Sequence, residues 1–569
     1  MNSRVDAPDV SLPAADRTTR KWAWPSERRL RVLLAVLVLA AAVIAIASRM
    51  LPSTTPVTSP TLSTKMPQLF DDLEERTFRY FWDTADLNTG LVPDRYPTPS
   101  FSSIAAVGFA LTAYPIGVER GYITREQARE RVLTTLRFFY SAPQGEGASD
   151  AAGYKGFFYR FLDMTTGLRS GPIEVSTVDT ALLLGGVLFC QSYFDSSNDD
   201  ETAIRRLADE IYRRVDWRWA QARPPAISHG WTPEGGFIEH DWLGYNEAML
   251  VYILALGSPT HPVDPVAWEE WGRGYEHYWG ELYGQPHLTF TPLFGHQYSH
   301  VWIDFRGIVD GPMRKAGLDY FENSRRATYA QRAYAIENPM RWAGYGENIW
   351  GLTASDGSAD VELSFGGEMR RFRTYSARGI GMVYSVDDGT IAPTAAAASL
   401  PFAPEIVIPA VEEMHGRYGE YIYGKYGFFD AFNQSFDYDV PLAHGHIVPE
   451  FGWVDNDYVG INQGPIVAMI ENHRTGLIWR YTKRNPYIRR GLERAGFSGG
   501  WLDAPMPKAQ SVTGDALFAR WKTGCQAGLA RTTDDDSREP GPAPSLGLLH
   551  ACQQAAKSVA AGKGATEAS

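Results

Sequence analysis

The central part of this chain is predicted to be an all-α domain whose helical hairpins close into a toroid. Apolar residues recur at three- and four-residue spacing along most of it, as in helices with one buried face. Strand-like patches are short and lie near residues 360–390, where they predict a small β-hairpin inserted into the helical domain. No fixed-period repeat and no linker interrupts residues 66–507, so we expect one undivided domain and not a repeat array. The predicted helices are 69–81, 104–119, 124–140, 177–193, 203–215, 245–256, 266–279, 320–334, 404–418 and 463–473.

Local signals mark where some of these helices begin and end. Gly257 and Pro259 stop the helix 245–256. Pro465 is predicted in the first turn of the last helix, where its missing N–H costs little. In a toroid of hairpins, we expect the chemistry on the loops at one end of the inner helices.

The segment before the domain is predicted to anchor the chain in a membrane. The run 32–47 has no polar side chain, and residues 32–50 are long enough to span a bilayer. Several Arg and Lys residues stand in the leader 1–31, and few follow the run, which predicts a cytoplasmic N-terminus. A Pro/Ser/Thr-rich stalk, 51–65, would hold the domain in the periplasm at the inner membrane. A signal peptide cleaved after Ala47 is the alternative, and it would release the domain into the periplasm.

The C-terminal segment 508–569 is predicted to be a largely disordered tail. The chain has 3 Cys with no metal-binding spacing. Cys190 lies in an apolar run and is expected in the core. Cys525 and Cys552 fall in the tail, where a disulfide between them is compatible with an oxidising compartment; whether they pair stays open.

The composition restricts the classes of function. The chain has 569 residues, 44% of them hydrophobic and 21% charged, which excludes a disordered chain and a polytopic membrane protein. Its net charge of -12 makes nucleic acid a poor partner. Aromatic residues reach 13%, and such rings either fill a core or stack on flat ligand faces such as those of sugars.

Three carboxylates stand at or just before the predicted starts of helices. Glu174 precedes the helix 177–193 and Asp179 lies in its first turn, where an acid either projects into a cleft or complements the helix dipole. Glu247 lies directly before AMLVYILAL. Burial there raises a carboxyl pKa, and a carboxyl that keeps its proton at neutral pH can act as a general acid. Helix capping is the alternative role for Glu247.

Other loops combine aromatic, acidic and amide side chains, as a neutral polyhydroxylated ligand requires. His296 and His300 are four residues apart, but no HExxH-type pattern accompanies them, so neither a metal site nor a cofactor is predicted. No phosphate-binding glycine loop, dinucleotide fingerprint or GxSxG motif is present either. The candidates in these loops are Trp302 and Arg306, then Glu347 and Trp350, and finally Asp430, Asp457, Asn462 and Gln463.

Six long motifs resemble one known family. They are STVDTALLLGG, WLGYNEAMLVYILALGSPTHP, YGENIWGLTASDG, APTAAAASLPFAPE, YGKYGFFDAFN and DYVGINQGPIVAMIENHRTGLIW. In this order they resemble the bacterial glycoamylase-like (glucoamylase-like) family around glycoside hydrolase family 144 and the endo-β-1,2-glucanases, over about residues 69–492. The resemblance implies an (α/α)6 toroid that hydrolyses β-1,2-glucan with inversion and without a metal. It does not cover the anchor, stalk or tail.

The resemblance also implies roles for particular residues. Glu247, in the GYNEAM motif, corresponds to the general acid, and Asp179, in STVDT, to an essential acidic residue of the cleft. The base differs between relatives, and Glu347, Asp457 and Asp430 stay candidates.

We expect the substrate-binding residues to supply stacking faces and hydrogen bonds to sugar hydroxyls. The stacking candidates are Trp231, Trp242, Trp302 and Trp350; the polar candidates are His240, Asn246, Arg306 and Gln463, and Tyr245, His296 and Asn462 complete the set.

Two other functions remain open at this point. The same fold could act on cyclic or branched periplasmic glucans or on an α-glucan. A non-catalytic glucan-binding protein of the envelope would keep the aromatic faces without needing a carboxylate pair. A monomer is expected in each case.

Overall fold

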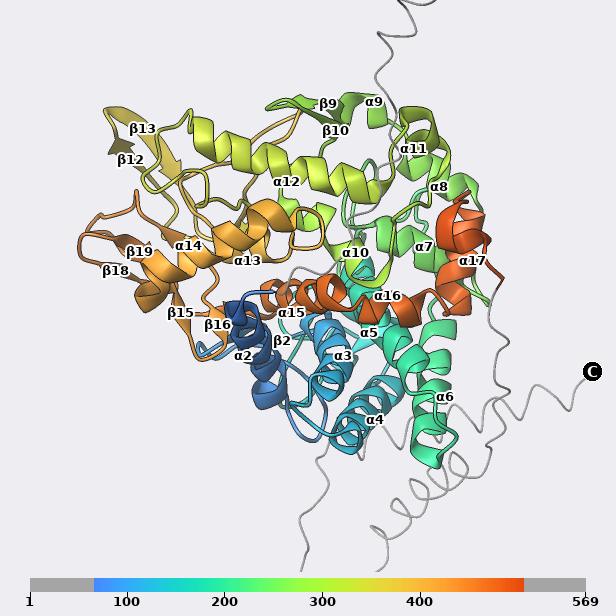
Figure 1. Ribbon diagram of the computed structural model, residues 1–569. Coiled ribbons are helices and arrows are strands. Elements are labelled where there is room, and N and C mark those ends of the chain that lie inside the picture. The colour runs from blue at the N-terminus through green and yellow to red at the C-terminus, as the bar shows by residue number, and fades with distance from the viewer. Residues whose placement is uncertain (1–65, 506–569) are drawn as a thin grey trace, which may run out of the picture. The chain divides into compact units, whose positions relative to one another are not determined.

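The computed structural model describes residues 66–505, which lie in one compact unit and form an α/α toroid, as predicted (Figure 1). No helix among these residues is long and apolar enough to cross a membrane. The predicted leader, anchor, stalk and tail, with Cys525 and Cys552, lie outside the described residues.

The inner ring consists of helices that are buried on almost every side. A helix that is apolar all round belongs inside a domain, and every residue of α7 is buried. Pairwise packing closes the ring: α3 packs on α5 and α15, α5 on α7 and α10, and α15 on α10 and α13. The inner helices are α3 (Ile104–Glu119), α5 (Thr177–Tyr193), α7 (Met249–Gly257), α10 (Tyr298–Trp302), α13 (Pro393–Ala397) and α15 (Gly460–Arg474).

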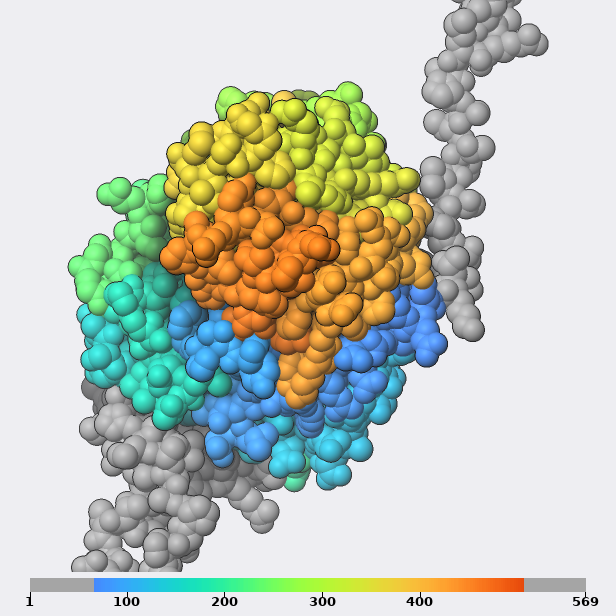
Figure 2. Space-filling model, turned by 90° about the vertical axis from the view of Figure 1, so that its left-hand side faces the viewer, coloured from blue at the N-terminus to red at the C-terminus, as the bar shows by residue number. Residues whose placement is uncertain are grey.

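The outer helices alternate with the inner ones along the chain and bury one face each. The blue N-terminal and orange C-terminal segments of the domain lie side by side, because α2 and α3 pack on α15 and complete the ring (Figure 2). The outer helices are α2 (Gln68–Thr84), α4 (Arg125–Ser141), α6 (Asp199–Arg213), α8 (Val266–Trp271), α12 (Tyr320–Glu337) and α14 (Pro404–Ile422). Shorter helices are α9 (Tyr275–Tyr278), α11 (Gly311–Ala316), α16 (Leu477–Thr482) and α17 (Pro486–Arg494), with 3-10 turns η1 (Leu293–His296) and η2 (Gly500–Asp503).

Short antiparallel strands join the entrances of the inner helices at one end of the toroid. β2 (Ser102–Ser103) leads into α3, β6 (Val175–Ser176) into α5, and β20 (Tyr458–Val459) into α15. Ser103 and Ser176 then cap the helices that follow, each accepting a hydrogen bond from a first-turn N–H. The N-terminal ends of the inner helices are therefore held together at one mouth.

The remaining strands are short and mostly paired in two-stranded ribbons. The predicted hairpin is confirmed as β12 (Val361–Phe365) and β13 (Glu368–Phe372), with Val361 opposite Phe372. A five-stranded sheet in the order β3-β4-β6-β7-β8 was not predicted. Its other strands are β3 (Gly153–Tyr154), β4 (Phe157–Tyr159), β7 (Gly230–Thr232) and β8 (Gly236–Phe237). The others are β1 (Arg95–Tyr96), β5 (Phe161–Leu162), β9 (Trp279–Leu282), β10 (Gln285–Leu288), β11 (Ala354–Ser355), β14 (Ser376–Ala377), β15 (Tyr423–Gly424), β16 (Gly427–Phe428), β17 (Phe432–Asn433), β18 (His446–Val448) and β19 (Gly452–Val454).

The prediction that Pro465 opens its helix is wrong, because α15 begins at Gly460 and Pro465 lies inside it. Proline has no N–H, so the carbonyl one turn before it loses its helical partner. That carbonyl, of Ile461, accepts a hydrogen bond from the Tyr298 hydroxyl at 3.1 Å instead. The proline thus allows α10 to contact α15 at the mouth of the toroid.

The free cysteine of the described region is buried as predicted. Pro115 interrupts α3 in the same way, and the carbonyl of Leu111 accepts from the Cys190 thiol at 3.1 Å. Cys190 therefore belongs to the contact between α3 and α5.

Two glycines let the backbones of α3 and α5 touch. A Cβ on Gly108 would lie 2.3 Å from the Leu182 carbonyl oxygen, and one on Gly186 would lie 2.1 Å from the carbonyl oxygen of Gly108. Larger residues would force these inner helices apart, because neither obstacle is a movable side chain.

Gly186→Ala is expected to lower the free energy of unfolding by about 1–3 kcal/mol or more. Gly416→Ala is the matched control, since nothing lies within 4 Å of a Cβ there, on the outer helix α14. Ala is a better helix former than Gly, so the control should gain roughly 0.5–1 kcal/mol. Urea unfolding of both variants measures the difference; equal effects would contradict the backbone contact.

Candidate active site

Glu247 lies at the mouth of the toroid, just before α7. The segment around it is not helical, so the predicted start of this helix at residue 245 is wrong and the helix begins at Met249. The main-chain carbonyl of Glu247 accepts a hydrogen bond from Ser299 Oγ on α10 at 3.3 Å. Within residues 66–505, no group hydrogen-bonds to its buried Oε2. The backbone of Glu247 is thus held by α10, while Oε2 of its carboxyl group remains free to bond with a ligand.

Burial raises the pKa of Glu247 to about 7, and the negative charge of Asp179 contributes to the rise. Its ordinary value is 4.5. A carboxylic acid with a pKa near 7 still carries its proton in neutral solution and can release it during a reaction. Glu247 therefore has the environment of a general acid.

Asp179 faces the same mouth from the first turn of α5. Its Oδ2 accepts a hydrogen bond from Ser176 Oγ at 2.5 Å and lies 3.2 Å from Nε of Arg160. Arg160 also pairs with Glu174. One guanidinium therefore holds two carboxylates, and Asp179 is fixed on both sides beside Glu247.

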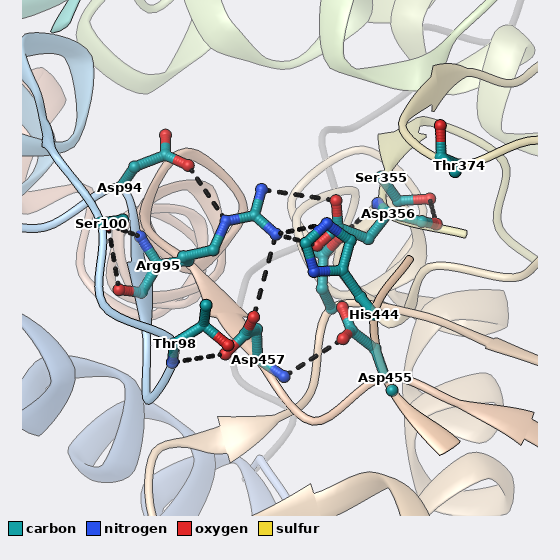
Figure 3. A network of polar contacts seen from close by, with 12 residues as sticks. Asp94, Arg95, Thr98, Ser100, Ser355, Asp356, Thr374, His444, Asp455 and Asp457 are labelled. Atoms are coloured by element: carbon teal, nitrogen blue, oxygen red, sulfur yellow. Dashed lines mark hydrogen bonds and ion pairs between the residues drawn. The ribbon is translucent and has the colours of Figure 1, made fainter. Parts of the chain in front are cut away.

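A second group of acidic residues gathers around Arg95 (Figure 3). Arg95 of β1 extends into it and pairs with Asp356 at 2.6 Å and with Asp457 at 3.8 Å. The other oxygen of Asp457 accepts from the backbone N–H of Thr98 at 2.9 Å. The side chains of Asp356 and Asp457 are fully buried.

Asp430 and Asp455 complete this second group. Asp430 accepts from the N–H of Asp356 at 2.8 Å and from the amide of Asn462 at 2.6 Å. Burial, with the negative charge of Asp356, raises the pKa of Asp430 to about 7. The same two causes raise the pKa of Asp455.

Tyr298 connects the two acidic groups. Its hydroxyl binds the Ile461 carbonyl, and burial raises its pKa, with further contributions from Tyr375, Glu247 and Asp430. The pKa of Tyr298 is therefore affected by carboxylates of both groups. Tyr298 thus lies within electrostatic range of both acidic groups.

A pocket opens beside Glu247 and has an exposed apolar rim. It is lined by Tyr245 and Asn246 on one side and by the loop Gly381–Tyr384 on the other. Met382, Val383 and Tyr384 are 44%, 59% and 53% exposed, which is unusual for adjacent apolar residues. Their faces are the kind of surface on which a sugar ring can stack.

The predictions for Trp302 and Trp350 as stacking faces are wrong. Trp302 is fully buried, stacks on Phe109 and donates its N–H to Thr112 at 3.0 Å. Trp350 is 1% exposed and belongs to a hydrophobic core cluster. Both rings stabilise the packing of the toroid.

Trp242 and Trp231 lie nearer the mouth. Trp242 is largely buried; it stacks on His229 with ring centroids 3.7 Å apart and donates its N–H to Thr177 of α5. Trp231 is half-buried beside Tyr154, so a sugar-stacking role remains a prediction for Trp231 alone of the four tryptophans.

Three more candidates are buried. Tyr245 packs against His296, whose ring accepts from the backbone N–H of Phe290 at 3.2 Å. Asn246 accepts from the N–H of Ala248 at 3.0 Å and so orders the turn that carries Glu247. The amide of Asn246 is thus engaged inside the protein, and direct binding of a sugar hydroxyl by it is not supported. Nδ1 of His296 is buried and has no hydrogen-bond partner in the described part of the chain, so a binding role for His296 stays a prediction.

Arg306 and Glu347 are not part of either acidic group. Arg306 follows the C-terminal end of α10 and makes two hydrogen bonds of 2.7 Å with Asp304, which places it at the opposite end of the toroid from Glu247. Glu347 is 70% exposed and pairs with Arg332 of α12. Its exposure and its ion pair make it unsuited to act as the base.

The last predicted residues differ in accessibility. Asn462 and Gln463 are buried in the first turn of α15, where Gln463 donates to the Phe428 carbonyl at 2.8 Å. Asn462 donates a hydrogen bond from its amide to Asp430. His240 is exposed, and its binding role stays a prediction.

Sequence reasoning missed several residues of the site, among them Arg160, Asp94, Arg95, Asp356 and Tyr375. Asp94 and Arg95 stand before the first inner helix, as Asp179 and Glu247 stand before or within the next ones. Applying that positional pattern to every helix entrance would have identified them. Asp356 had no such signal, because a long loop carries it.

The raised pKa of Glu247 predicts the pH dependence of any reaction in which it donates a proton. Activity should fall as the pH rises through about 7, because the acid is then deprotonated. Asp179→Asn should move this alkaline limb to lower pH, since the negative charge of Asp179 helps to raise the pKa. The pH profile of kcat/KM measures both, and a limb near 4.5 in the unchanged chain would contradict the assignment.

Comparison with known proteins agrees with this geometry. Residues 239–486 match the family model described as "Putative glucoamylase". The chain is 31% identical to a solved "putative glucoamylase" from Bacteroides uniformis, covering 78% of this chain and 100% of that one, with a TM-score of 0.65. An endo-β-1,2-glucanase from Chitinophaga pinensis, solved with sophorotriose and glucose, is 29% identical over 76% of this chain and 99% of its own, with a TM-score of 0.64.

Another relative is longer than the region that it shares with this chain. An exo β-1,2-glucooligosaccharide sophorohydrolase from Parabacteroides distasonis is 30% identical over 459 residues, or 75% of this chain. The match spans 57% of that relative's length. With identity of this level over the full length of a solved member and with the α/α toroid in common, the chain belongs to the glycoamylase-like family.

Proposed function

We propose that this chain is a glycoside hydrolase that cleaves β-1,2-linked glucan, with Glu247 as the proton donor. The observation that carries the proposal is the carboxyl of Glu247, held by its backbone at the mouth of the toroid with a pKa of about 7. Relatives that act on β-1,2-glucans supply the substrate class.

Glycosidic cleavage needs a second carboxylate besides the acid. The second acidic group supplies Asp457 and Asp430 as candidates for the base, both buried and both fixed by hydrogen bonds. We propose an inverting reaction in which one of them activates water on the far side of the sugar. An inverting pair stands roughly 6.5–9.5 Å apart, and a pair near 5 Å apart would form a covalent intermediate instead.

A second part of the proposal concerns where the enzyme cleaves the glucan chain and which products it releases. We favour internal cleavage, which releases a ladder of oligosaccharides from linear β-1,2-glucan. The sophorohydrolase relative makes the exo mode a specific second candidate, in which the disaccharide sophorose is the main product from the start.

The purified chain should be incubated with linear β-1,2-glucan, cyclic β-1,2-glucan, β-1,3-glucan and starch, and the products separated over time. We expect hydrolysis of linear β-1,2-glucan well above that of β-1,3-glucan and starch. Early sophorose alone would favour the exo mode. Hydrolysis of starch alone would overturn the substrate assignment, and binding without turnover would favour a glucan-binding protein.

We also propose that residues 32–50 hold the domain in the periplasm at the inner membrane, with no catalytic role for the anchor. Fractionation of cells that express the full chain tests this. Recovery with the inner membrane supports an anchor, and recovery in the periplasmic fraction supports cleavage after Ala47.

A further inference from the structure

Three buried aspartates from separate loops meet within the second acidic group. Asp356 follows β11, Asp430 lies between β16 and β17, and Asp455 follows β19. They are at most 2% exposed, and one carboxylate oxygen of each lies within 4.8 Å of the others. Buried carboxylates at such distances repel one another strongly unless a positive charge or a proton stands between them.

Of the three aspartates, Arg95 forms an ion pair only with Asp356. Its guanidinium lies among Asp356, Asp457 and His444, whose ligand atoms form a second close set (Figure 3). Within residues 66–505, no Lys or Arg forms an ion pair with Asp430 or Asp455. Arg95 thus pairs with Asp356 alone of the three and acts on Asp430 only at longer range, so Asp430 and Asp455 have no ion pair of their own among the described residues.

Asp455 supplies an independent sign of a ligand. Its Oδ1 accepts the backbone N–H groups of Asn456 and Asp457, at 2.8 and 3.2 Å. Its Oδ2 is buried and has no hydrogen-bond partner in the described part of the chain. The strongest charges acting on this carboxyl are those of Asp356 and Asp430, both negative. A buried carboxylate oxygen normally has a donor or a cation as its partner.

We infer that Asp356, Asp430 and Asp455 bind a divalent cation, with calcium preferred. The donors are all carboxylate oxygens, which hard cations favour over zinc or copper. They come from irregular loops, and calcium tolerates irregular coordination and completes it with main-chain carbonyls or water, whereas magnesium requires a near-ideal octahedron. His444 of the neighbouring set lies beside Arg95 and is not one of the proposed calcium ligands.

The cation would tie together three loops that reach the mouth of the toroid. Asp457, whose Oδ1 binds the Thr98 N–H, follows Asp455 by two residues, so the same ion would order that loop. The role is structural and adds no step to hydrolysis; a calcium-bound Asp430 would not act as the base, which leaves that role to Asp457. It holds whether or not the proposed activity is correct, because its readouts are binding and stability.

The test uses the full chain, first dialysed against EDTA. After incubation with CaCl2 and desalting, elemental analysis should find one calcium ion per chain, and the thermal unfolding midpoint should exceed that in EDTA by several degrees. MgCl2 should raise the midpoint less. An equal rise with MgCl2 would contradict the calcium preference.

Two variants separate the site from other acidic surfaces. Asp455→Asn should lose the bound calcium and the calcium-dependent rise in the midpoint. Asp437→Asn, at an exposed acid in the loop after Asp430, should keep both.

The elemental analysis of the unchanged chain decides the matter even if Asp455→Asn fails to fold. No retained calcium and equal midpoints in CaCl2 and EDTA would overturn the proposal. In that case, a higher midpoint for Asp455→Asn in both buffers would mean that shared protons neutralise the cluster.

Discussion

Glu247→Gln is expected to reduce the rate of β-1,2-glucan hydrolysis by about 10²–10⁴-fold, the usual contribution of a general acid. Gln has the same shape and fills the same turn before α7, so the fold should be unchanged. It cannot donate a proton to the leaving oxygen. Initial rates of product release from linear β-1,2-glucan measure the loss.

The leaving group distinguishes proton donation from other roles of Glu247. On an aryl β-sophoroside with a strongly acidic phenol, the leaving group needs no proton, so the loss should be much smaller than on the glucan. Glu412→Gln, an exposed acid of α14, is the control and should leave both rates unchanged. Equal losses on both substrates would contradict the role of Glu247 as the acid.

Arg378→Met is expected to lower the free energy of unfolding by about 3–5 kcal/mol, because it leaves the carboxylate of Asp388 buried without its partner. Arg378 is fully buried and binds both oxygens of Asp388, at 2.6 and 2.9 Å. It also donates to the main-chain carbonyls of Ser355 and Asp356, at 2.9 and 3.2 Å. Its loss therefore also loosens the loop that places Asp356 in the site.

Denaturant unfolding of matched variants measures this effect. Arg325→Met breaks the half-exposed pair with Glu405 and should cost at most about 1 kcal/mol. Arg378→Met combined with Asp388→Leu should recover much of the stability, since no unpaired charge remains. A cost for Arg378→Met no larger than that for Arg325→Met would show that the buried pair is not important for stability.

The long inner helices could be predicted from the sequence because their signals are local. The predicted ranges 104–119 and 177–193 coincide with α3 and α5. The predicted helix 266–279 is instead split into α8 and α9, because Gly274 between them adopts a φ of 89°. The inner helices α10 and α13 have only 5 residues each, too few for a periodic pattern, and were missed.

The candidate site was predictable only in part, for a related reason. Asp179 and Glu247 stand within or just before helices that the sequence predicts, and the structure brings them together with Arg160. The second acidic group is assembled from loops far apart in the chain, and only Asp430 and Asp457 of it were expected.

Tryptophans show the limit of residue type as a guide. Nothing in the sequence around Trp302 distinguishes it from a tryptophan that stacks on a sugar. Gly185 leaves the space that its ring occupies, since a Cβ there would lie 2.6 Å from the indole. Only the three-dimensional contact between α5 and α10 shows that this ring belongs to the core.

A crystal structure of the Glu247→Gln chain with a bound β-1,2-glucooligosaccharide tests the central claim most directly. We predict that the sugar lies in the mouth between the two acidic groups. The amide of residue 247 should then be within hydrogen-bond distance of the scissile oxygen or of a hydroxyl next to it. An oligosaccharide bound elsewhere, or one whose linkages all lie beyond reach of residue 247, would contradict the account.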